Sequence, residues 1–152
     1  MSQPELDEVY NVYPRLFIGA YWPQLNFQRI KRKGIIAIVN LMEDNLYDPC
    51  SLGFTYLYKG FPDETYPSHE YIEDILDFIE EHIQEGGVLV HCAMGLSRSA
   101  GIVLAYLMKE NPSWSWDKAL THVNQTRSVF PAIEIKQSIL DYFESIEGHR
   151  RE

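Results

Sequence analysis

Residues 86–100 read GGVLVHCAMGLSRSA, and this stretch decides the fold. Its start, Val-Leu-Val at residues 88–90, is a short apolar run of the length of a buried strand. A short loop follows, and residues 99–108 are then apolar nearly all round, which is typical of a helix inside a domain. The stretch therefore predicts a buried strand, a tight loop and a buried helix.

The same alternation of strand and helix patterns continues outward from this stretch. Apolar or β-branched runs of strand length lie at residues 15–20, 35–41, 54–59 and 88–92. Helical patterns fill most of the gaps, at residues 24–33 before Gly34, 72–83 behind a Ser68 cap, 116–127 behind a Ser115 cap, and 133–146. This order predicts an α/β fold with a central, mostly parallel sheet of four to five strands and helices on both sides.

Length and composition limit the class of protein. A chain of 152 residues with 45% hydrophobic residues suits one compact domain that buries roughly 70% of its unfolded surface. The net charge of -9 disfavours nucleic acid as a partner. The start of the chain has no signal-peptide pattern, Ser2 stands where myristoylation needs glycine, and no apolar run approaches the roughly 18 residues of a membrane span. With two cysteines only, we expect a cytoplasmic protein without a membrane partner, with entry into the nucleus left open.

The loop after residue 92 has the features of an anion-binding site. It lies at the carboxyl end of a sheet strand, where the following helix presents unpaired N–H groups and about half a positive charge. Gly95 allows backbone conformations in which successive N–H groups point inward. Arg98 can bind two phosphate oxygens at once with its planar guanidinium. We therefore expect a phosphate cradle formed by Ala93, Met94, Gly95, Leu96, Ser97 and Arg98.

Cys92 lies at the bottom of this loop, where the helix dipole, the N–H groups and Arg98 favour a thiolate and hence a nucleophile. A lone cysteine in an apolar strand is more often an inert small hydrophobe. Arg98 and Gly95 reverse that reading, because an arginine that opens a buried helix is costly unless it meets an anion. Ser99 offers a hydroxyl that can hold the thiolate as a covalent intermediate breaks down. His91 points to the other face of the strand, so we expect it to support the loop rather than act as base.

The pattern His91-Cys92-x-x-Gly95-x-x-Arg98-Ser99 resembles the active-site signature of the protein tyrosine phosphatase superfamily, and residues 105–108 (Ala-Tyr-Leu-Met) resemble its dual-specificity branch. Residues 12–19 resemble the opening strand of that branch, and residues 34–40 its second strand. The resemblance implies one catalytic domain over residues 1–152, with a core of about residues 10–147 and a protein tyrosine phosphatase-like fold. Sulfurtransferase loops are similar, but that family has one residue fewer between cysteine and arginine than the five found here.

A general acid must protonate the departing oxygen of a phosphate ester. Asp63 is the candidate, because it lies in a turn-prone segment, residues 60–64, after the third strand-like run. The resemblance places the acid of the superfamily here. Glu64 is a neighbouring competitor, and Asp44, Asp48 and Asp74 are less well placed.

The resemblance also implies a phosphorylated protein substrate and hydrolysis through a phosphocysteine, with no metal ion or cofactor. At 152 residues the chain has little room for the loops that deepen the pocket of phosphotyrosine-only relatives, so phosphoserine, phosphothreonine and phosphotyrosine are all expected. A phosphoinositide or an RNA 5′ end is an alternative substrate, but its extra phosphates would lack cationic partners in this loop. A silent phospho-residue binding module is a further alternative, against which Cys92, Arg98 and Asp63 argue. The oligomeric state stays open.

Three further features leave alternatives open. Arg127 and Pro131 resemble a segment that lines one side of the family's site, but Ala132 replaces the asparagine often found there. Cys50 could serve as a resolving thiol for an oxidised Cys92, or be unreactive and too distant. The basic residues within 29–33 match a helix carboxyl end, with partner docking as the alternative.

Overall fold

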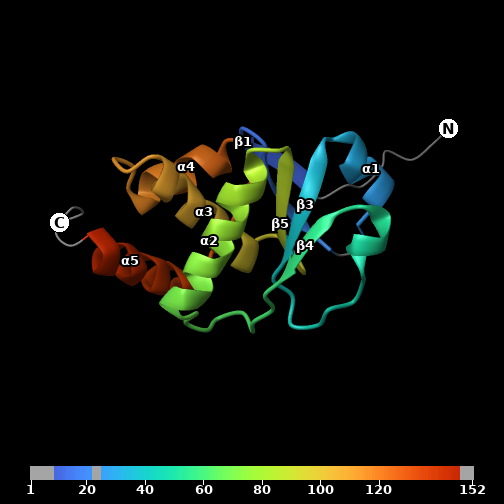
Figure 1. Ribbon diagram of the computed structural model, residues 1–152. Helices are drawn as coiled ribbons and strands as arrows, with labels where there is room; N and C mark the ends of the chain where they lie inside the picture. The colour runs from blue at the N-terminus through green and yellow to red at the C-terminus, as the bar shows by residue number, and fades with distance from the viewer. Residues whose placement is uncertain (1–8, 22–24, 148–152) are drawn as a thin grey trace.

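The computed structural model describes residues 9–21 and 25–147, which form a five-stranded sheet in the order β1-β2-β5-β3-β4 (Figure 1). The strands are β1 (Val9–Tyr13), β2 (Leu16–Ala20), β3 (Ile35–Asn40), β4 (Thr55–Tyr58) and β5 (Gly87–Cys92). β2, β5, β3 and β4 are parallel, and β1 pairs antiparallel with β2 at one edge. The prediction of a central, mostly parallel sheet is confirmed.

Helices cover both faces of this sheet (Figure 1). One face carries α2 (His69–Ile83), α3 (Arg98–Glu110), α4 (Trp116–Asn124) and α5 (Ile133–Glu147), and the other carries α1 (Phe27–Arg32) and the short 3-10 helix η1 (Pro49–Leu52). Ser68 caps α2 by accepting a hydrogen bond from Tyr71 N, and Ser115 caps α4 by accepting one from Lys118 N. The two predicted N-caps are therefore confirmed.

Two sequence predictions need correction. Residues 12–19, expected as one opening strand, contain the end of β1, a turn and the start of β2. Pro14 has no N–H for the ladder, and Arg15 adopts a left-handed φ of 63°, so the chain reverses there. The first helix is shorter than residues 24–33, because it begins at Phe27 behind an Asn26 cap; Gln24 lies outside the described residues.

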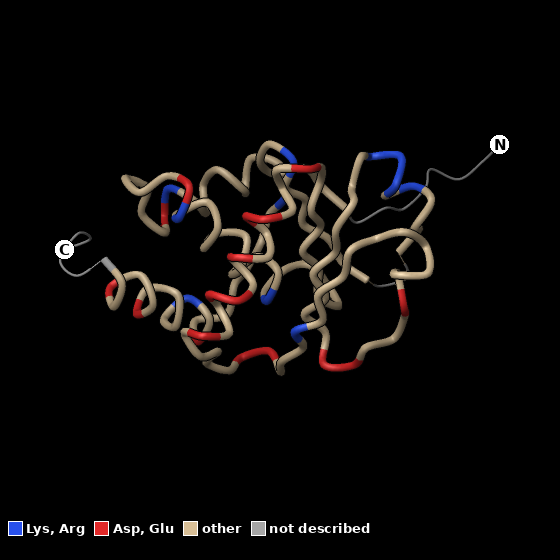
Figure 2. Tube along the Cα trace, in the orientation of Figure 1, with Lys and Arg blue, Asp and Glu red and all other residues tan. Residues whose placement is uncertain are grey.

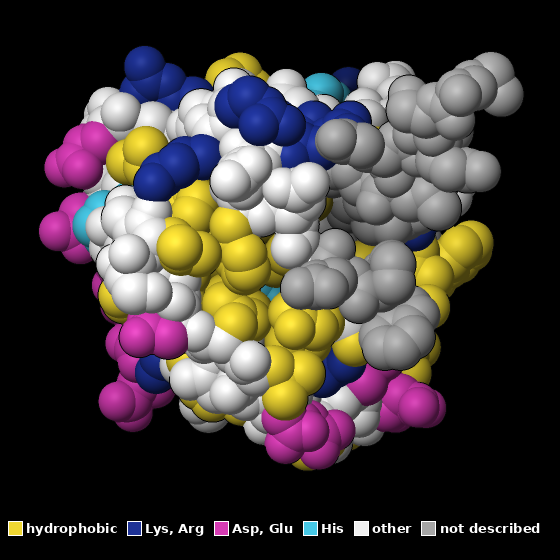
Figure 3. Space-filling view, turned by 90° about the vertical axis from the view of Figure 1, so that its right-hand side faces the viewer, with side chains coloured by type: hydrophobic (Ala, Val, Ile, Leu, Met, Phe, Trp, Pro, Cys, Tyr) yellow, Lys and Arg dark blue, Asp and Glu magenta, His cyan; other side chains and the backbone are white. Residues whose placement is uncertain are grey.

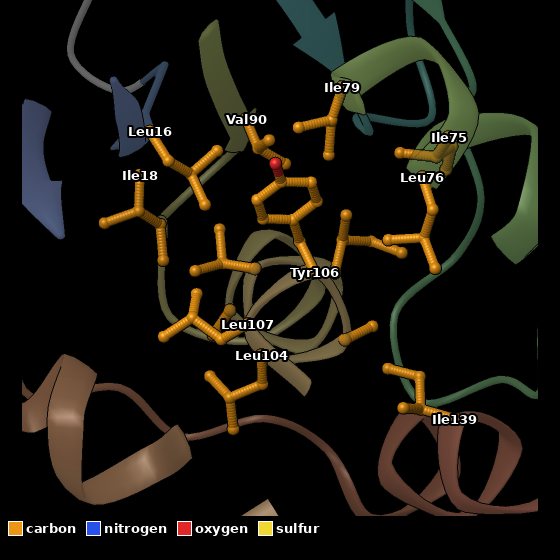
Figure 4. Packing of buried hydrophobic residues seen from close by; sticks show 14 of the residues in the cluster. Leu16, Ile18, Ile75, Leu76, Ile79, Val90, Leu104, Tyr106, Leu107 and Ile139 are labelled. Carbon is orange, nitrogen blue, oxygen red and sulfur yellow. The ribbon is translucent and has the colours of Figure 1, made fainter. Parts of the chain in front are cut away.

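The core fixes both elements that flank the candidate loop. β5 is the central strand, and all six of its residues are buried. Residues Ser99 to Met108 of α3 are buried as well. Figure 4 looks along this helix: Tyr106 extends toward Val90 of β5, and Leu107 lies on the side of Leu16 and Ile18. The loop between β5 and α3 therefore begins and ends on elements held by the core.

Charge is distributed unevenly over the two edges of the sheet. The loops that follow β3 and β4, at the lower edge in Figure 2, carry acidic residues, whereas the basic residues of α1 lie at the upper edge. Figure 3 shows the same polarity on one face, with basic side chains above, hydrophobic ones in the middle and acidic ones below.

Within the described residues, no helix is both long and apolar enough to cross a bilayer.

Candidate active site

The loop between β5 and α3 surrounds the sulfur of Cys92. Gly95 N donates a hydrogen bond of 3.2 Å to Cys92 Sγ, and Ser99 Oγ lies 3.3 Å from the same sulfur. The Cys92 side chain is only 2% exposed, and Ser99 is fully buried. Gly95 N and the Ser99 hydroxyl therefore hold the sulfur at the base of the loop.

Gly95 is required by both conformation and space. Its φ of +73° lies in the left-handed region, which favours glycine. A Cβ atom at this position would lie 2.9 Å from Gly19 O of β2. The loop can therefore pack against β2 and still point an N–H at the sulfur, as the sequence predicted for an anion cradle.

Arg98 is the first residue of α3 and lies between two loops. One of its terminal nitrogens donates to Phe61 O at 3.0 Å and to Leu41 O at 3.4 Å. Its buried Nε has no hydrogen-bond partner among the described residues. An unsatisfied buried donor costs about 1–3 kcal/mol, so an anion bound at this guanidinium would supply a missing partner. These contacts orient the guanidinium and leave donors for a ligand.

Asp63 lies directly against the cradle. Ser97 Oγ donates a hydrogen bond of 2.7 Å to Asp63 Oδ1, and Glu64 N donates one of 2.9 Å to the same oxygen. Glu64, the competing acid, thus contributes its backbone N–H to the network. The other carboxylates have different roles: Asp74 pairs with Lys59 at 3.1 Å, and Asp48 caps η1.

His91 lies on the opposite face of β5 from Cys92, among aromatic rings. Its Nδ1 is 3.3 Å from Cys92 O, its Nε2 is 2.5 Å from the hydroxyl of Tyr47, and the rings of Tyr21 and Tyr47 stack on it. Burial, above all, lowers the pKa of His91 to about 4, and the nearby Arg98 charge acts in the same direction. The imidazole is therefore neutral at pH 7. A carbonyl can only accept, so Nδ1 donates to Cys92 O and Nε2 accepts from Tyr47.

The segment before α5 also contacts the cradle, through its backbone. Phe130 N donates to Leu96 O at 2.7 Å, and Ala132 N donates to Ser97 Oγ at 3.0 Å. The guanidinium of Arg127 instead lies 5.4 Å from the centre of the Tyr10 ring. The segment therefore lines the site although Ala132 replaces an asparagine.

Cys50 is not positioned as a resolving thiol. It is exposed on η1, which a hydrogen bond from Lys31 Nζ to Leu52 O links to α1. Cys92 packs into the core on the α3 face, so the sheet lies between the two cysteines. A disulfide requires Cα atoms within about 7 Å and side chains that face each other, and this fold does not bring the two thiols together.

Comparison with known proteins identifies the family that carries such a site. Residues 16–145 match the family described as dual specificity phosphatase, catalytic domain. The chain belongs to the dual-specificity phosphatase family. The resemblance recognised in residues 91–99 is thereby confirmed.

Relatives in this family include the Slingshot phosphatases. The protein phosphatase Slingshot of Drosophila melanogaster is 30% identical over 147 residues, which is 95% of this chain and 14% of that protein. Slingshot homolog 3 of Rattus norvegicus is 33% identical over 127 residues, which is 81% of this chain and 19% of that protein. The chain thus spans less than a fifth of the length of these relatives.

Solved structures of similar proteins have the same fold. A mouse protein described as a dual-specificity phosphatase, in complex with zinc tungstate, superposes with a TM-score of 0.85 at 26% identity, covering 100% of this chain and 98% of that one. The human tyrosine phosphatase-like serine/threonine/tyrosine-interacting protein superposes with a TM-score of 0.81 at 27% identity, covering 93% and 98%.

Proposed function

We propose that this chain is a protein phosphatase that hydrolyses phosphotyrosine and phosphoserine or phosphothreonine through a phosphocysteine intermediate. One observation carries the proposal: the sulfur of Cys92 accepts a hydrogen bond from Gly95 N within a loop that leads directly to Arg98. Membership of the dual-specificity phosphatase family supports the reaction class. The Slingshot relatives, named as protein phosphatases, support a phosphorylated protein as substrate.

In the first step, the Cys92 thiolate attacks phosphorus in line with the ester oxygen. The P–S bond forms as the P–O bond breaks, and Asp63 protonates the departing oxygen. The two hydrogen bonds that Asp63 accepts from Ser97 and Glu64 both reach Oδ1. We therefore assign the transferred proton to Oδ2.

In the second step, water attacks the phosphocysteine and Asp63 accepts a proton from that water. The P–S bond breaks, inorganic phosphate leaves, and the Ser99 hydroxyl, 3.3 Å from the sulfur, stabilises the returning thiolate. The guanidinium of Arg98 and the loop N–H groups hold the equatorial phosphate oxygens in both steps, where charge complementarity lowers the barrier.

The direct test measures turnover of a generic aryl phosphate and of matched phosphotyrosine and phosphoserine peptides. Cys92→Ser should abolish turnover and keep phosphopeptide binding, whereas Cys50→Ser should behave as the parent. Acid quench and mass spectrometry should find phosphate on Cys92. Tight phosphopeptide binding without turnover in the parent would favour a silent binding module, and faster turnover of phosphoinositides or RNA 5′ ends would overturn the substrate class.

A further inference from the structure

A pocket of about 330 Å³ adjoins the phosphate cradle. Its lining residues are Met42, Glu43, Asp44, Leu46, Ala93 and Arg98. Ala93 and Arg98 belong to the cradle, and the other four come from the loop that follows β3. A substrate whose phosphate lies on Arg98 would therefore have a neighbouring group at the entrance of this pocket.

The lining combines apolar surface with two carboxylates. Met42, Leu46 and Ala93 supply the apolar part, and Leu46 remains 59% exposed. Glu43 and Asp44 are both exposed, and in the part of the chain that the structure describes neither has an ion pair with a lysine or arginine. An apolar stem with a cationic end matches such a lining, because long basic side chains bury their methylenes and keep the charged group at the surface.

Hydrogen bonds hold the loop that presents these carboxylates. Asn40 Oδ1 accepts from Met42 N at 2.9 Å, and the hydroxyl of Tyr58 donates to Glu43 O. Further along the loop, the hydroxyl of Tyr56 donates to the side chain of Asn45. A loop already fixed at both ends of the pocket loses little conformational entropy when a ligand binds, which favours recognition.

The surroundings reinforce the charge of the pocket. Asp63 and Glu64 lie on the loop after β4, and Figure 2 shows that both loops at this lower edge carry acidic residues. The basic residues of α1 lie at the opposite edge. A second phosphate beside the cradle would meet these carboxylates, whereas a cation would be attracted to them.

We propose that this pocket is a subsite for a lysine or arginine side chain adjacent, or nearly adjacent, to the phosphorylated residue. Consecutive Cα atoms lie about 3.8 Å apart, which places the flanking residues within reach of a pocket that shares Arg98 with the phosphate. The inference rests on the proposed phosphatase function and names its substrate class: phosphoprotein segments with a basic flank. Arg98 repels a free cation until phosphate neutralises it, so the preference belongs to phosphorylated ligands.

The test compares two phosphopeptides that differ only in lysine or glutamate at the residues flanking the phosphate. Exposed charge pairs are individually weak, so with two carboxylates we expect kcat/KM to favour the lysine peptide by about threefold to tenfold. High salt should reduce this ratio, because the carboxylates are exposed to solvent. The doubly substituted variant Glu43→Gln, Asp44→Asn should bring the ratio close to one.

A matched control removes the same charge elsewhere. The variant Glu81→Gln, Glu85→Gln changes two exposed carboxylates near the carboxyl end of α2, which lies away from the pocket, and it should keep both the parental ratio and parental turnover of an aryl phosphate.

Equal kcat/KM for both peptides in the parent, or an unchanged ratio in the Glu43→Gln, Asp44→Asn variant, would overturn the subsite. Failure of the phosphatase proposal would differ, since the parent would then turn over neither peptide nor aryl phosphate. The ratio of peptide affinities for Cys92→Ser would still test the pocket in that case, with equal affinities refuting it.

Discussion

Ser97 Oγ donates a hydrogen bond of 2.7 Å to Asp63 Oδ1 and accepts one of 3.0 Å from Ala132 N. One hydroxyl thus joins three segments: the loop after β4, the phosphate cradle and the chain before α5. The candidate acid is therefore held by the same loop that holds the candidate nucleophile. The geometry assigns Ser97 a positioning role in addition to its place in the cradle.

We expect Ser97→Ala to slow reactions that depend on the acid. A well-placed general acid contributes about 10²- to 10⁴-fold, so a loosened Asp63 should cost about tenfold in kcat for alkyl phosphates. Aryl phosphates with good leaving groups should lose much less. Steady-state kinetics with a leaving-group series measures the difference, and an equal loss across the series would show that Ser97 does not act through Asp63.

Asp63→Asn and Glu64→Gln separate the two neighbouring carboxylates. Asp63→Asn should lower kcat for alkyl phosphates by about 10²-fold or more and flatten the basic limb of the pH–rate profile, because no acid remains to lose its proton. Glu64→Gln should keep the parental profile, since only its backbone N–H contacts Asp63. A flattened basic limb in Glu64→Gln but not in Asp63→Asn would show that Glu64, and not Asp63, is the general acid.

Arg98→Lys tests the need for a planar, forked cation. Lysine cannot bind two phosphate oxygens in the same way, and hydrogen bonds to charged groups are worth about 1.5–3 kcal/mol. We expect inhibition by inorganic phosphate to weaken by roughly 10- to 100-fold, as measured by competition with an aryl phosphate. Lys109→Arg, near the other end of α3, is the matched control and should leave inhibition by inorganic phosphate at the parental level. Undiminished phosphate affinity in Arg98→Lys would contradict the assignment.

His91 should make stability depend on pH below neutrality. Its folded pKa of about 4 lies below the ordinary value of 6.5, so the unfolded chain takes up the proton first as pH falls. The contribution of the neutral His91 side chain to the free energy of unfolding is fully present above pH 6.5. It is lost between pH 6.5 and 4, and the loss is about 3 kcal/mol. Urea unfolding of the parent and of His91→Asn at pH 7, 6, 5 and 4 measures it. The difference in unfolding free energy should shrink toward pH 4, and parallel curves would refute the assignment.

Tyr47→Phe should destabilise the fold by removing the partner of a buried nitrogen. His91 Nε2 would then have no donor, and an unsatisfied buried group costs about 1–3 kcal/mol. Thermal unfolding measures this loss, with Tyr66→Phe as control because the Tyr66 side chain is 67% exposed. Equal melting temperatures for the parent and Tyr47→Phe would mean that another donor replaces the hydroxyl.

Local patterns explain what the sequence could predict. The parallel strands are short apolar runs, and Cys92, Gly95, Arg98 and Ser99 lie within eight residues of one another, so their spacing was visible in the sequence. The sequence does not predict β1 as a separate strand, because Pro14 follows it and residues Val9–Tyr13 form neither a continuous apolar run nor a strict alternation. η1 is four residues long and has no period to detect.

The remaining parts of the site depend on contacts between distant segments. Ser97 meets Asp63 across 34 positions, His91 meets Tyr47 across 44, and Arg98 meets the carbonyl of Leu41 across 57. A tyrosine in an irregular loop has no signal that marks it as a histidine partner, and a backbone carbonyl has none at all. Tertiary packing alone decides these partners.

The central place of β5 has a consequence for the stability of the strand that carries the sulfur of Cys92. β5 is hydrogen-bonded to a parallel neighbour on each side, and it ends at Cys92. Amide hydrogens in such a strand exchange with solvent only through the largest opening motions. Fraying of the outer helices would therefore leave β5 paired, and its amide hydrogens should exchange only with the cooperative melting of the whole domain.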